Sequence, residues 1–229
     1  MPARPLLSVG ILTADWMQMG SELGRLEDAG ADYVHIDVMD GCFCPQLTAG
    51  PPVISGLRTS LRKDVHLMIE EPLEKVGAYV DAGAEVVTVH VESTRHPHRV
   101  LQALGSMKTR TGGSVARGIA LNPGTPTSSV EPLLGLAELV LVLAVNPGWS
   151  GQRFLPETEG RLAAVREMVG RTGRDVLVGV DGGVTRDNIG ALAAMGVDLI
   201  VTGSAVFDGR DPAANLRQVR AAADGASVR

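Results

Sequence analysis

The stretch Asp28-Ala-Gly-Ala-Asp-Tyr-Val-His-Ile-Asp-Val-Met39 places a glycine between a helical pattern and an apolar strand. Two later stretches, Asp81-Ala-Gly-Ala-Glu85 and Ala194-Met-Gly-Val-Asp198, repeat this arrangement at the same kind of boundary. A glycine at such a point adopts the left-handed conformation that ends a helix without a Cβ clash, and the acidic residue then leads into the next strand. The repeat therefore predicts a chain of alternating helices and strands.

Eight segments are typical of strands, because they are apolar or alternate between apolar and polar residues. The expected strands are 7–13, 33–39, 64–69, 86–92, 118–122, 139–146, 176–181 and 199–204, and the clearest helical segments are 15–29, 72–82, 156–169, 186–195 and 212–223. Regular strand–helix alternation requires right-handed crossovers and yields a parallel sheet. We therefore expect a single (β/α)8 TIM barrel over residues 1–229, with a tail that frays after about residue 223.

Composition and charge exclude several classes of protein. The net charge is −5, and the basic residues are scattered among acidic ones, so no nucleic-acid footprint is present. The longest strongly apolar run, 139–145, is far shorter than the roughly 20 residues that cross a bilayer, and residues 1–12 lack the features of a secretory signal. Cys42 and Cys44 stand too close in the sequence for a useful disulfide. We therefore expect a cytoplasmic protein with reduced thiols.

Polar residues at the carboxyl ends of the expected strands are the first candidates for chemistry, because barrels of this kind build their active sites there. His35, Asp37 and Met39 share one face of the second strand, since side chains alternate along a strand. The third strand repeats the order of imidazole and thioether with His66 and Met68. Taken singly, a strand carboxylate also fits a loop cap and a strand histidine also fits the core. Their recurrence on neighbouring strands favours a site.

Asp181, at the end of the seventh strand, enters the expected barrel mouth from the opposite side. Two imidazoles and two carboxylates can then converge on one divalent cation. Mixed nitrogen and oxygen ligands suit Zn²⁺, Fe²⁺, Mn²⁺ or Co²⁺, and the residues do not choose among these metals.

Glycine-rich segments after the sixth, seventh and eighth strands indicate a phosphate site. They are the loop Asn146-Pro-Gly148-Trp149-Ser150-Gly151-Gln152, the pair Gly182-Gly183 before an expected helix start at 185–187, and Gly203-Ser204. Glycines let backbone amides approach an anion, and barrels often bind phosphate after strands seven and eight. Each pair alone also fits an ordinary turn.

A metal beside two carboxylates and a phosphate-binding site indicates proton abstraction next to a carbonyl group. One carboxylate would remove the proton and the other would return a proton from the opposite face, which inverts a carbon centre. Met39 and Met68 would cover the planar intermediate without offering protons.

Six motifs in order strongly resemble those of ribulose-phosphate 3-epimerases. They are His35-Ile-Asp-Val-Met-Asp-Gly41, Asp64-Val-His-Leu-Met68, Val145-Asn-Pro-Gly148, Gly151-Gln152, Val180-Asp-Gly-Gly183 and Gly203-Ser-Ala-Val-Phe207. The resemblance covers nearly the whole chain. It implies a barrel of the ribulose-phosphate-binding type, a homo-oligomer of the pentose phosphate pathway, and an isomerase (EC 5.1.3.1) that interconverts D-ribulose 5-phosphate and D-xylulose 5-phosphate.

The resemblance also assigns roles to residues. It implies a metal held by His35, Asp37, His66 and Asp181, with Asp37 and Asp181 as the acid/base pair on opposite faces of the substrate. The implied contacts to the sugar phosphate are His66, Gly148, Trp149, Ser150, Gly151, Asp181, Gly182, Gly183, Gly203 and Ser204, supported by Met39 and Met68.

Several positions depart from the family pattern. Gly10 replaces a serine that touches substrate, Leu143 replaces a third methionine, Cys42 and Cys44 occupy a loop that usually reads Asp-Gly-His-Phe-Val-Pro-Asn, and Trp149-Ser150 replaces Phe-Gly. The departures keep open the same chemistry on another ketose phosphate, such as D-allulose 6-phosphate.

Two other classes fit the sequence less well. The related sugar-phosphate lyases carry an Asp-x-Lys-x-x-Asp signature, whereas no lysine stands between His35 and Asp40. A non-catalytic phosphate-binding barrel would not need the complete set of ligands. We assign His90 and Glu92 to the surroundings of the site and His96 and His98 to a solvated loop.

Overall fold

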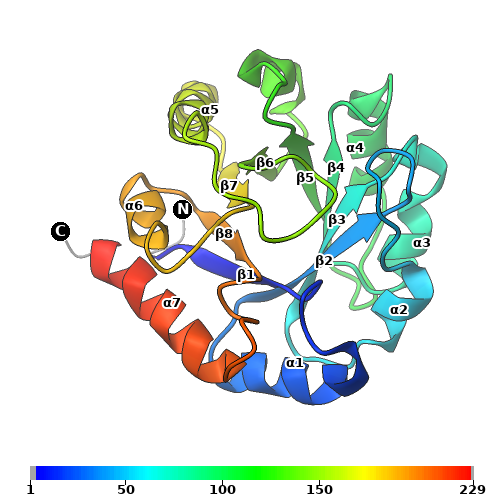
Figure 1. Cartoon of the computed structure of the whole chain (residues 1–229). Helices are drawn as coiled ribbons and strands as arrows, with labels where there is room; N and C mark the ends of the chain where they lie inside the picture. The colour runs from blue at the N-terminus through cyan, green and yellow to red at the C-terminus, as the bar shows by residue number, and fades with distance from the viewer. Residues whose placement is uncertain (1–3, 228–229) are drawn as a thin grey trace.

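The computed structural model describes residues 4–227, which form one closed barrel of parallel strands (Figure 1). The strands follow one another in chain order, and pairing of the last strand with the first closes the ring. They are β1 Leu6–Gly10, β2 Tyr33–Met39, β3 Arg62–Met68, β4 Val86–His90, β5 Ala116–Leu121, β6 Leu139–Leu143, β7 Leu177–Asp181 and β8 Leu199–Thr202. The predicted (β/α)8 architecture is confirmed.

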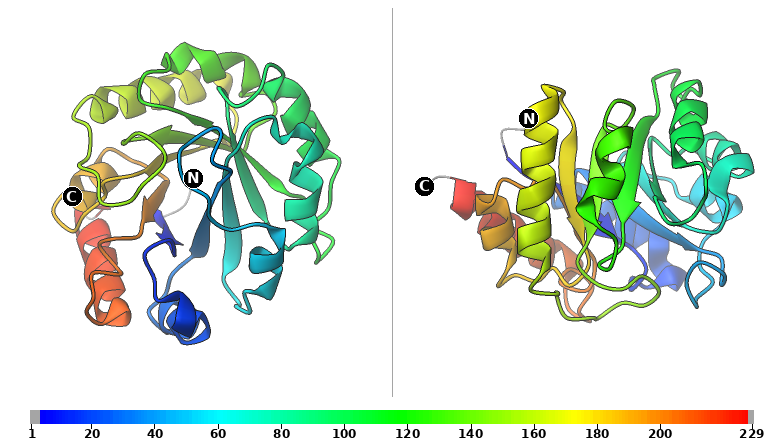
Figure 2. Two further views of the ribbon diagram at one scale, coloured as in Figure 1. Left: turned by 45° about the vertical axis from the view of Figure 1, so that its right-hand side comes forward. Right: turned by 90° about the horizontal axis from the view of Figure 1, so that it is seen from above.

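Helices surround the barrel in a ring (Figure 2). They are α1 Met19–Asp28, α2 Pro51–Gly56, α3 Val76–Asp81, α4 Pro97–Gly105, α5 Thr158–Thr172, α6 Ile189–Ala194 and α7 Pro212–Ser227, with the 3₁₀ helices η1 Trp16–Gln18, η2 Pro72–Glu74 and η3 Thr127–Leu133. Between β5 and β6 the crossover is η3, which contains Pro132 and does not continue as an α-helix. Within residues 4–227, no helix is both long and apolar enough to span a membrane.

The observed helix ends differ from three sequence expectations. The expected helix 186–195 begins only at Ile189, because residues 186–188 form a turn. The expected helix 156–169 is displaced to Thr158–Thr172 and ends at Gly173, which has a φ of 67°. The last helix continues to Ser227, past the point where fraying was expected, and residues 228–229 lie outside the described part of the chain. Fraying of the tail stays a prediction.

The repeated glycines end their helices as predicted. Gly30, Gly83 and Gly196 have φ values of 82°, 108° and 76°, the left-handed region that favours glycine. After each glycine the next amide donates to a carbonyl five residues earlier, for example Ala31 to Leu26 at 3.0 Å. This bond satisfies an end carbonyl of the helix and turns the chain towards the next strand.

The acidic residues that open the even-numbered strands have a shared structural role. Each of these side chains accepts a hydrogen bond from a backbone amide. The Leu7 amide donates to Asp32 at 2.8 Å and the Lys63 amide to Glu85 at 3.3 Å. The Arg117 amide donates to Glu138 and the Val178 amide to Asp198, both at 2.9 Å. Each of these amides belongs to the second residue of the preceding odd-numbered strand. The amino end of the barrel is therefore fixed four times by the same contact, away from the carboxyl ends.

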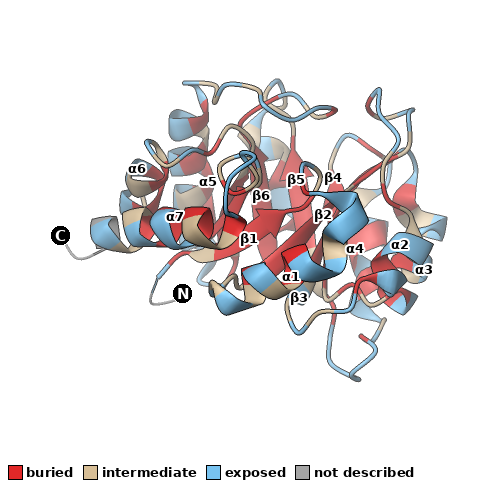
Figure 3. Ribbon diagram, turned by 60° about the horizontal axis from the view of Figure 1, so that its bottom comes forward, coloured by how far each residue is buried: buried red, intermediate tan, exposed pale blue. Residues whose placement is uncertain are grey.

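The strands of the barrel are largely buried (Figure 3), and buried side chains lie on both of their faces. The outer layer, between strands and helices, is apolar. The barrel interior is divided: β6 and β8 fill it with leucine and valine, whereas β1 to β4 bury polar side chains. The buried polar side chains on β1 to β4 are Ser8, His35, Asp64, His66, Thr88 and His90. Buried polar groups usually have hydrogen-bond partners. Here the contacts of Asp64 with Ser8 and His35, and of His66 with His90, form the base of the site.

Candidate functional site

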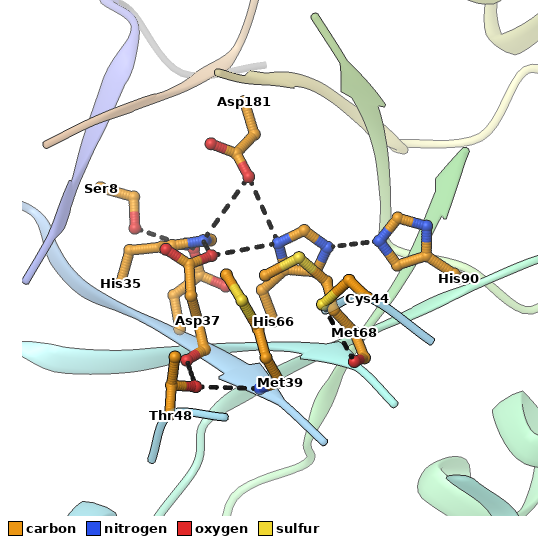
Figure 4. A network of polar contacts seen from close by, with 11 residues as sticks. Ser8, His35, Asp37, Met39, Cys44, Thr48, His66, Met68, His90 and Asp181 are labelled. Atoms are coloured by element: carbon orange, nitrogen blue, oxygen red, sulfur yellow. Dashed lines mark hydrogen bonds and ion pairs between the residues drawn. The ribbon is translucent and has the colours of Figure 1, made fainter. Parts of the chain in front are cut away.

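Four side chains converge at the carboxyl end of the barrel: His35 and Asp37 from β2, His66 from β3 and Asp181 from β7 (Figure 4). Each offers one ligand atom, and these atoms all lie within 4.8 Å of one another. His66 Nδ1 is 3.5 Å from Asp37 Oδ1 and 3.3 Å from Asp181 Oδ2. His35 Nε2 is 3.3 Å and 3.9 Å from the same two oxygens. The convergence expected from the strand order is therefore present.

The register of the strands explains how residues that are distant in sequence meet. Asp37 pairs with His66 across the boundary between β2 and β3. Two residues of displacement return a side chain to the same face, so His35 and Asp37 both point inward. Asp181 is the last residue of β7, where the strand meets the open mouth. The two imidazoles are fully buried, while the two carboxylates are 17% and 16% exposed at the top of the cluster.

His35 is oriented from below by Asp64, a residue to which the sequence analysis gave no role. Its Nδ1 lies 2.8 Å from Asp64 Oδ2, which also accepts a hydrogen bond of 2.8 Å from the Ser8 hydroxyl. With a proton on Nδ1, the lone pair of Nε2 points into the cluster. Asp64 and His66 are two residues apart on β3, so both side chains face the barrel interior. This spacing is the signal in the sequence that places Asp64 near the site.

His66 is held from the side by a second histidine. Its Nε2 lies 2.8 Å from Nε2 of His90, and Nδ1 of His90 lies 3.2 Å from Oε2 of Glu92. His90 ends β4, whereas Glu92 lies in the turn beyond it, so the expected strand 86–92 stops earlier. Both residues lie beside the cluster and outside the set of four ligands, as the sequence indicated.

Electrostatics bind the cluster together. Burial opposes the charged form of both imidazoles, yet Asp64 and Asp37 raise the pKa of His35 well above its usual value, and Asp181 and Asp37 raise that of His66. Burial would raise the pKa of the Asp37 carboxyl, but His35 and His66 hold it below its usual range. Without a cation, the carboxylates therefore favour the protonated form of the imidazoles, and the imidazoles favour the ionised form of Asp37.

The donor set fits a divalent metal. His35 Nε2 and His66 Nδ1 are buried polar atoms without a hydrogen-bond partner, although carboxylate oxygens lie within 4 Å. In a tetrahedral site with bonds of about 2.0–2.1 Å, neighbouring ligand atoms stand about 3.3–3.4 Å apart. Three nitrogen–oxygen distances, 3.3, 3.5 and 3.3 Å, are close to this spacing, whereas His35 Nε2 and Asp181 Oδ2 stand farther apart at 3.9 Å. These residues could hold one cation.

A cavity opens directly above the cluster. It is lined by Gly10, Leu12, Thr13, Asp37, Met39, Met68, Val145, Gly148, Trp149, Ser150, Gly151, Gln152, Asp181, Gly182, Gly183, Val184, Val201, Thr202, Gly203 and Ser204. All the glycine-rich segments predicted to bind phosphate meet here, with the two methionines beside them. His66 does not line the cavity, because its ring lies beneath the carboxylates. No lining residue carries a basic side chain.

Comparison with known proteins assigns the chain to a family. Residues 6–207 match the model of the ribulose-phosphate 3 epimerase family. The chain belongs to this family. The chloroplastic ribulose-5-phosphate-3-epimerase of Arabidopsis thaliana is 39% identical over 97% of this chain and 79% of its own length, and the ribulose-phosphate 3-epimerase of Rhodobacter capsulatus is 40% identical over 96% of both. The corresponding Aquifex aeolicus enzyme is 38% identical over 94% of this chain and 95% of its own length.

Solved structures that are more distant in sequence share the fold. KGPDC from Streptococcus mutans superposes with a TM-score of 0.72 at 14% identity, covering 97% of this chain and 98% of its own. A 3-hexulose-6-phosphate synthase superposes with a TM-score of 0.64 at 18% identity, covering 96% and 99%. At such identities the likeness concerns the barrel alone.

Two positions that depart from the epimerase pattern affect the cavity differently. Gly10 lines it, and no side chain of β1 takes the place of the missing hydroxyl, because Ser8 donates to Asp64 below. Leu143 packs in the barrel interior and does not line the cavity.

The two cysteines and the exposed histidines are not among the four clustered ligands. Cys42 is exposed and Cys44 is buried against Met39 and Met68, and neither forms a disulfide. His96 and His98 are exposed as expected, but His98 lies in the first turn of α4 and not in a loop.

Glycines shape the cradle because neighbouring chain leaves no room for side chains. A Cβ on Gly183 would stand 2.5 Å from the Phe154 amide nitrogen, and one on Gly148 would stand 2.8 Å from Cδ of Pro45. The Asn188 side chain bridges the loop, since it donates to the Gly183 carbonyl at 3.0 Å and accepts from the Thr185 amide at 2.8 Å. The expected helix dipole at 185–187 is replaced by this turn.

Proposed function

We propose that this protein interconverts D-ribulose 5-phosphate and D-xylulose 5-phosphate by metal-dependent epimerisation at C3. The observation that carries the proposal is the pair Asp37 and Asp181, two carboxylates from opposite sides of the barrel that meet over two buried imidazoles beneath one cavity. Membership of the epimerase family supports the same reaction.

The two carboxylates divide the proton transfers between them. Each uses one oxygen towards the imidazoles, Oδ1 of Asp37 and Oδ2 of Asp181, which leaves its second oxygen free to exchange a proton with substrate. Asp37 acts on one face of C3 and Asp181 on the other, so removal by one and return by the other inverts the carbon. In the metal-free protein the lowered pKa of Asp37 keeps this carboxyl ionised, so both of its oxygens can act as acceptors.

His35, Asp37, His66 and Asp181 would hold the divalent cation. When bound, it supplies positive charge that stabilises the enediolate formed after C3 loses its proton. Zn²⁺, Fe²⁺, Mn²⁺ and Co²⁺ all suit two nitrogens and two carboxylate oxygens. Met39 and Met68 face the same cavity with apolar thioethers that give no proton to the intermediate.

The phosphate group would be bound by backbone amides from the three glycine-rich segments. In the described part of the chain, neither the Gly183 amide nor the Ser204 amide donates a hydrogen bond to another protein group. Both residues line the cavity, together with the loop from Gly148 to Gly151. Uncharged amide donors without a basic side chain suit a small anion, because they hold it in one position by hydrogen bonds and not by an opposite charge. His66, which does not line the cavity, would hold the cation and would not touch the sugar.

Gly10 favours one alternative substrate class, a longer ketose phosphate such as D-allulose 6-phosphate, because it lines the cavity without a side chain at the position where the family pattern has a serine. A cytoplasmic location and a homo-oligomeric assembly stay predictions.

The test is a panel of ketose phosphates with each of the four metals. The metal-free protein is loaded with Zn²⁺, Fe²⁺, Mn²⁺ or Co²⁺ and incubated in D₂O with D-ribulose 5-phosphate, D-xylulose 5-phosphate or D-allulose 6-phosphate. NMR then follows the appearance of the epimer and deuterium at C3. We expect the fastest exchange with the pentulose phosphates and none in the chelated protein. No turnover of D-ribulose 5-phosphate with any metal would overturn the proposal.

A further inference from the structure

His90 and Glu92 lie outside the four-residue cluster but connect to it through one continuous line of contacts. His66 Nε2 and His90 Nε2 are 2.8 Å apart, and the two rings are nearly parallel, at 14°, with centroids 4.9 Å apart. The nitrogens are much closer than the centroids, so the rings meet edge to edge. Two imidazole nitrogens at this distance share a single proton, which belongs to one ring and is accepted by the other.

Glu92 is held so that only one of its oxygens faces His90. Its Oε1 accepts hydrogen bonds from the Asn122 amide at 2.7 Å and from the Thr125 hydroxyl. Its Oε2 lies 3.2 Å from Nδ1 of His90. The turn that provides the two donors is fixed by Arg161, which donates to the carbonyls of Asn122 at 2.8 Å and Thr125 at 2.7 Å.

These contacts determine where each proton lies. A carboxylate only accepts, so His90 must carry its proton on Nδ1, where it donates to Glu92. A neutral His90 then has its lone pair on Nε2 and accepts the proton of His66 Nε2. That arrangement leaves the lone pair of His66 on Nδ1, the atom that faces the cluster. His90 is fully buried and Phe43 packs against its ring, with centroids 4.7 Å apart, so water does not compete for these positions.

We propose that Glu92, acting through His90, sets the tautomer of His66 that presents a lone pair to the cation. Glu92 and His90 are positioning residues, since neither faces the cavity. The inference rests on the metal site of the proposed function and adds a determinant of its affinity from outside the ligand set. Partners of this kind around metal-bound histidines typically change metal affinity 10- to 100-fold.

Glu92→Gln tests the direction of the relay with little change of shape. The Asn122 amide and the Thr125 hydroxyl require an acceptor at the Oε1 position, so the glutamine carbonyl occupies it and the NH₂ group faces His90. His90 Nδ1 must then accept, its proton moves to Nε2, and His66 must accept on Nε2. The proton of His66 is thereby placed on Nδ1, where the cation should bind.

Two control variants separate the relay from a general loss of charge or of packing. Glu85→Gln removes one carboxylate at the opposite end of β4, where Glu85 bonds the Lys63 amide. Thr125→Val removes one donor to Oε1 but leaves the carboxylate facing His90. We expect about 10- to 100-fold weaker Zn²⁺ binding for Glu92→Gln by calorimetry. We expect values close to wild type for both controls, and thermal unfolding to confirm the fold of each variant.

¹⁵N NMR of the histidine rings gives a readout that a merely structural role would not move. In metal-free wild type at alkaline pH we expect the proton of His90 on Nδ1 and that of His66 on Nε2, with both reversed in Glu92→Gln. A wild-type His90 protonated on Nε2, an unchanged tautomer in the variant, or equal weakening by Glu85→Gln would each overturn the proposal. If the wild type bound none of the four metals, the metal site itself would fail, and the tautomers would still test the relay.

Discussion

Gly10 at the end of β1 lies beside Gly203, just beyond the end of the neighbouring strand β8. A Cβ on Gly10 would stand 3.7 Å from the Gly203 Cα, an ordinary van der Waals distance, whereas a Cβ on Gly203 would stand 3.0 Å from the Gly10 carbonyl oxygen. Space for a side chain therefore exists on the β1 side only. Both glycines line the cavity, so this space is open to substrate.

Gly10→Ser is expected to fold normally and to raise kcat/KM for D-ribulose 5-phosphate by roughly 2- to 10-fold. The reason is one added hydrogen bond to substrate, worth about 0.5–1.5 kcal/mol. Steady-state kinetics measure the effect.

Gly10→Ala is the matched control, because it fills the same space without a hydroxyl and should give no gain. A fall in kcat/KM for both variants would mean that substrate itself occupies the space above Gly10, as a longer ketose phosphate would require.

Asp181→Asn should lower kcat by about 10²- to 10⁴-fold, because it removes one of the two proton-transferring groups. Asp37 remains, so we expect C3 of only one epimer to continue exchanging with D₂O. Inorganic phosphate should still bind within a few-fold of wild type, since the Gly183 and Ser204 amides are untouched. The assay is run at saturating Zn²⁺ with metal content measured, and exchange of both epimers at wild-type rates would contradict the mechanism.

The sequence predicted the barrel and the ligand cluster for physical reasons that can be traced to particular residues. Period-two alternation placed His35 and Asp37 on one face, and the order of the strands placed His66 beside them. Asp181 followed from the closure of the barrel. These conclusions depend on which strands are neighbours and which face each side chain takes, and the strand and helix patterns of the sequence predict both.

Features that depend on side-chain partners were out of reach. Asp64 could be assigned to the interior, but its contact with both His35 and Ser8 depends on the stagger between β1, β2 and β3. Glu92 lies in a turn and reaches back to His90, which no strand periodicity describes. The start of α6 was misplaced because the turn before it is held by the Asn188 side chain, which bonds both Gly183 and Thr185.

Binding of a cation should release protons from the two imidazoles, and the affinity of the protein for the cation should fall as the pH is lowered. In the metal-free protein, burial lowers the pKa values of His35 and His66, but the carboxylates of Asp64, Asp37 and Asp181 raise them by more. Both pKa values therefore lie above the usual 6.5. A cation needs the unprotonated nitrogens, so protons compete increasingly as pH falls through these raised values. Affinity should then drop roughly tenfold per pH unit for each imidazole.

Calorimetry of Zn²⁺ binding in buffers with different ionisation enthalpies counts the protons directly. Near pH 6.5 we expect roughly one to two protons released per cation, one from each imidazole. Binding without proton release, at an affinity independent of pH, would show that the cation does not contact His35 Nε2 and His66 Nδ1.

Gly183→Ala should destabilise the protein and weaken phosphate binding together. The residue has a φ of 64°, and the added Cβ would stand 2.5 Å from the Phe154 amide nitrogen, so either the loop or the chain at Phe154 must move. Gly209→Ala is the control, because Gly209 has a φ of 85°, no neighbour within 4 Å of an added Cβ, and no place in the cavity lining. We expect only the strain of the left-handed backbone there, about 1–2 kcal/mol, and a larger fall in the unfolding free energy for Gly183→Ala. Thermal unfolding and titration with inorganic phosphate measure the two effects, and equal losses for both variants would show that close packing against Phe154 does not shape the cradle.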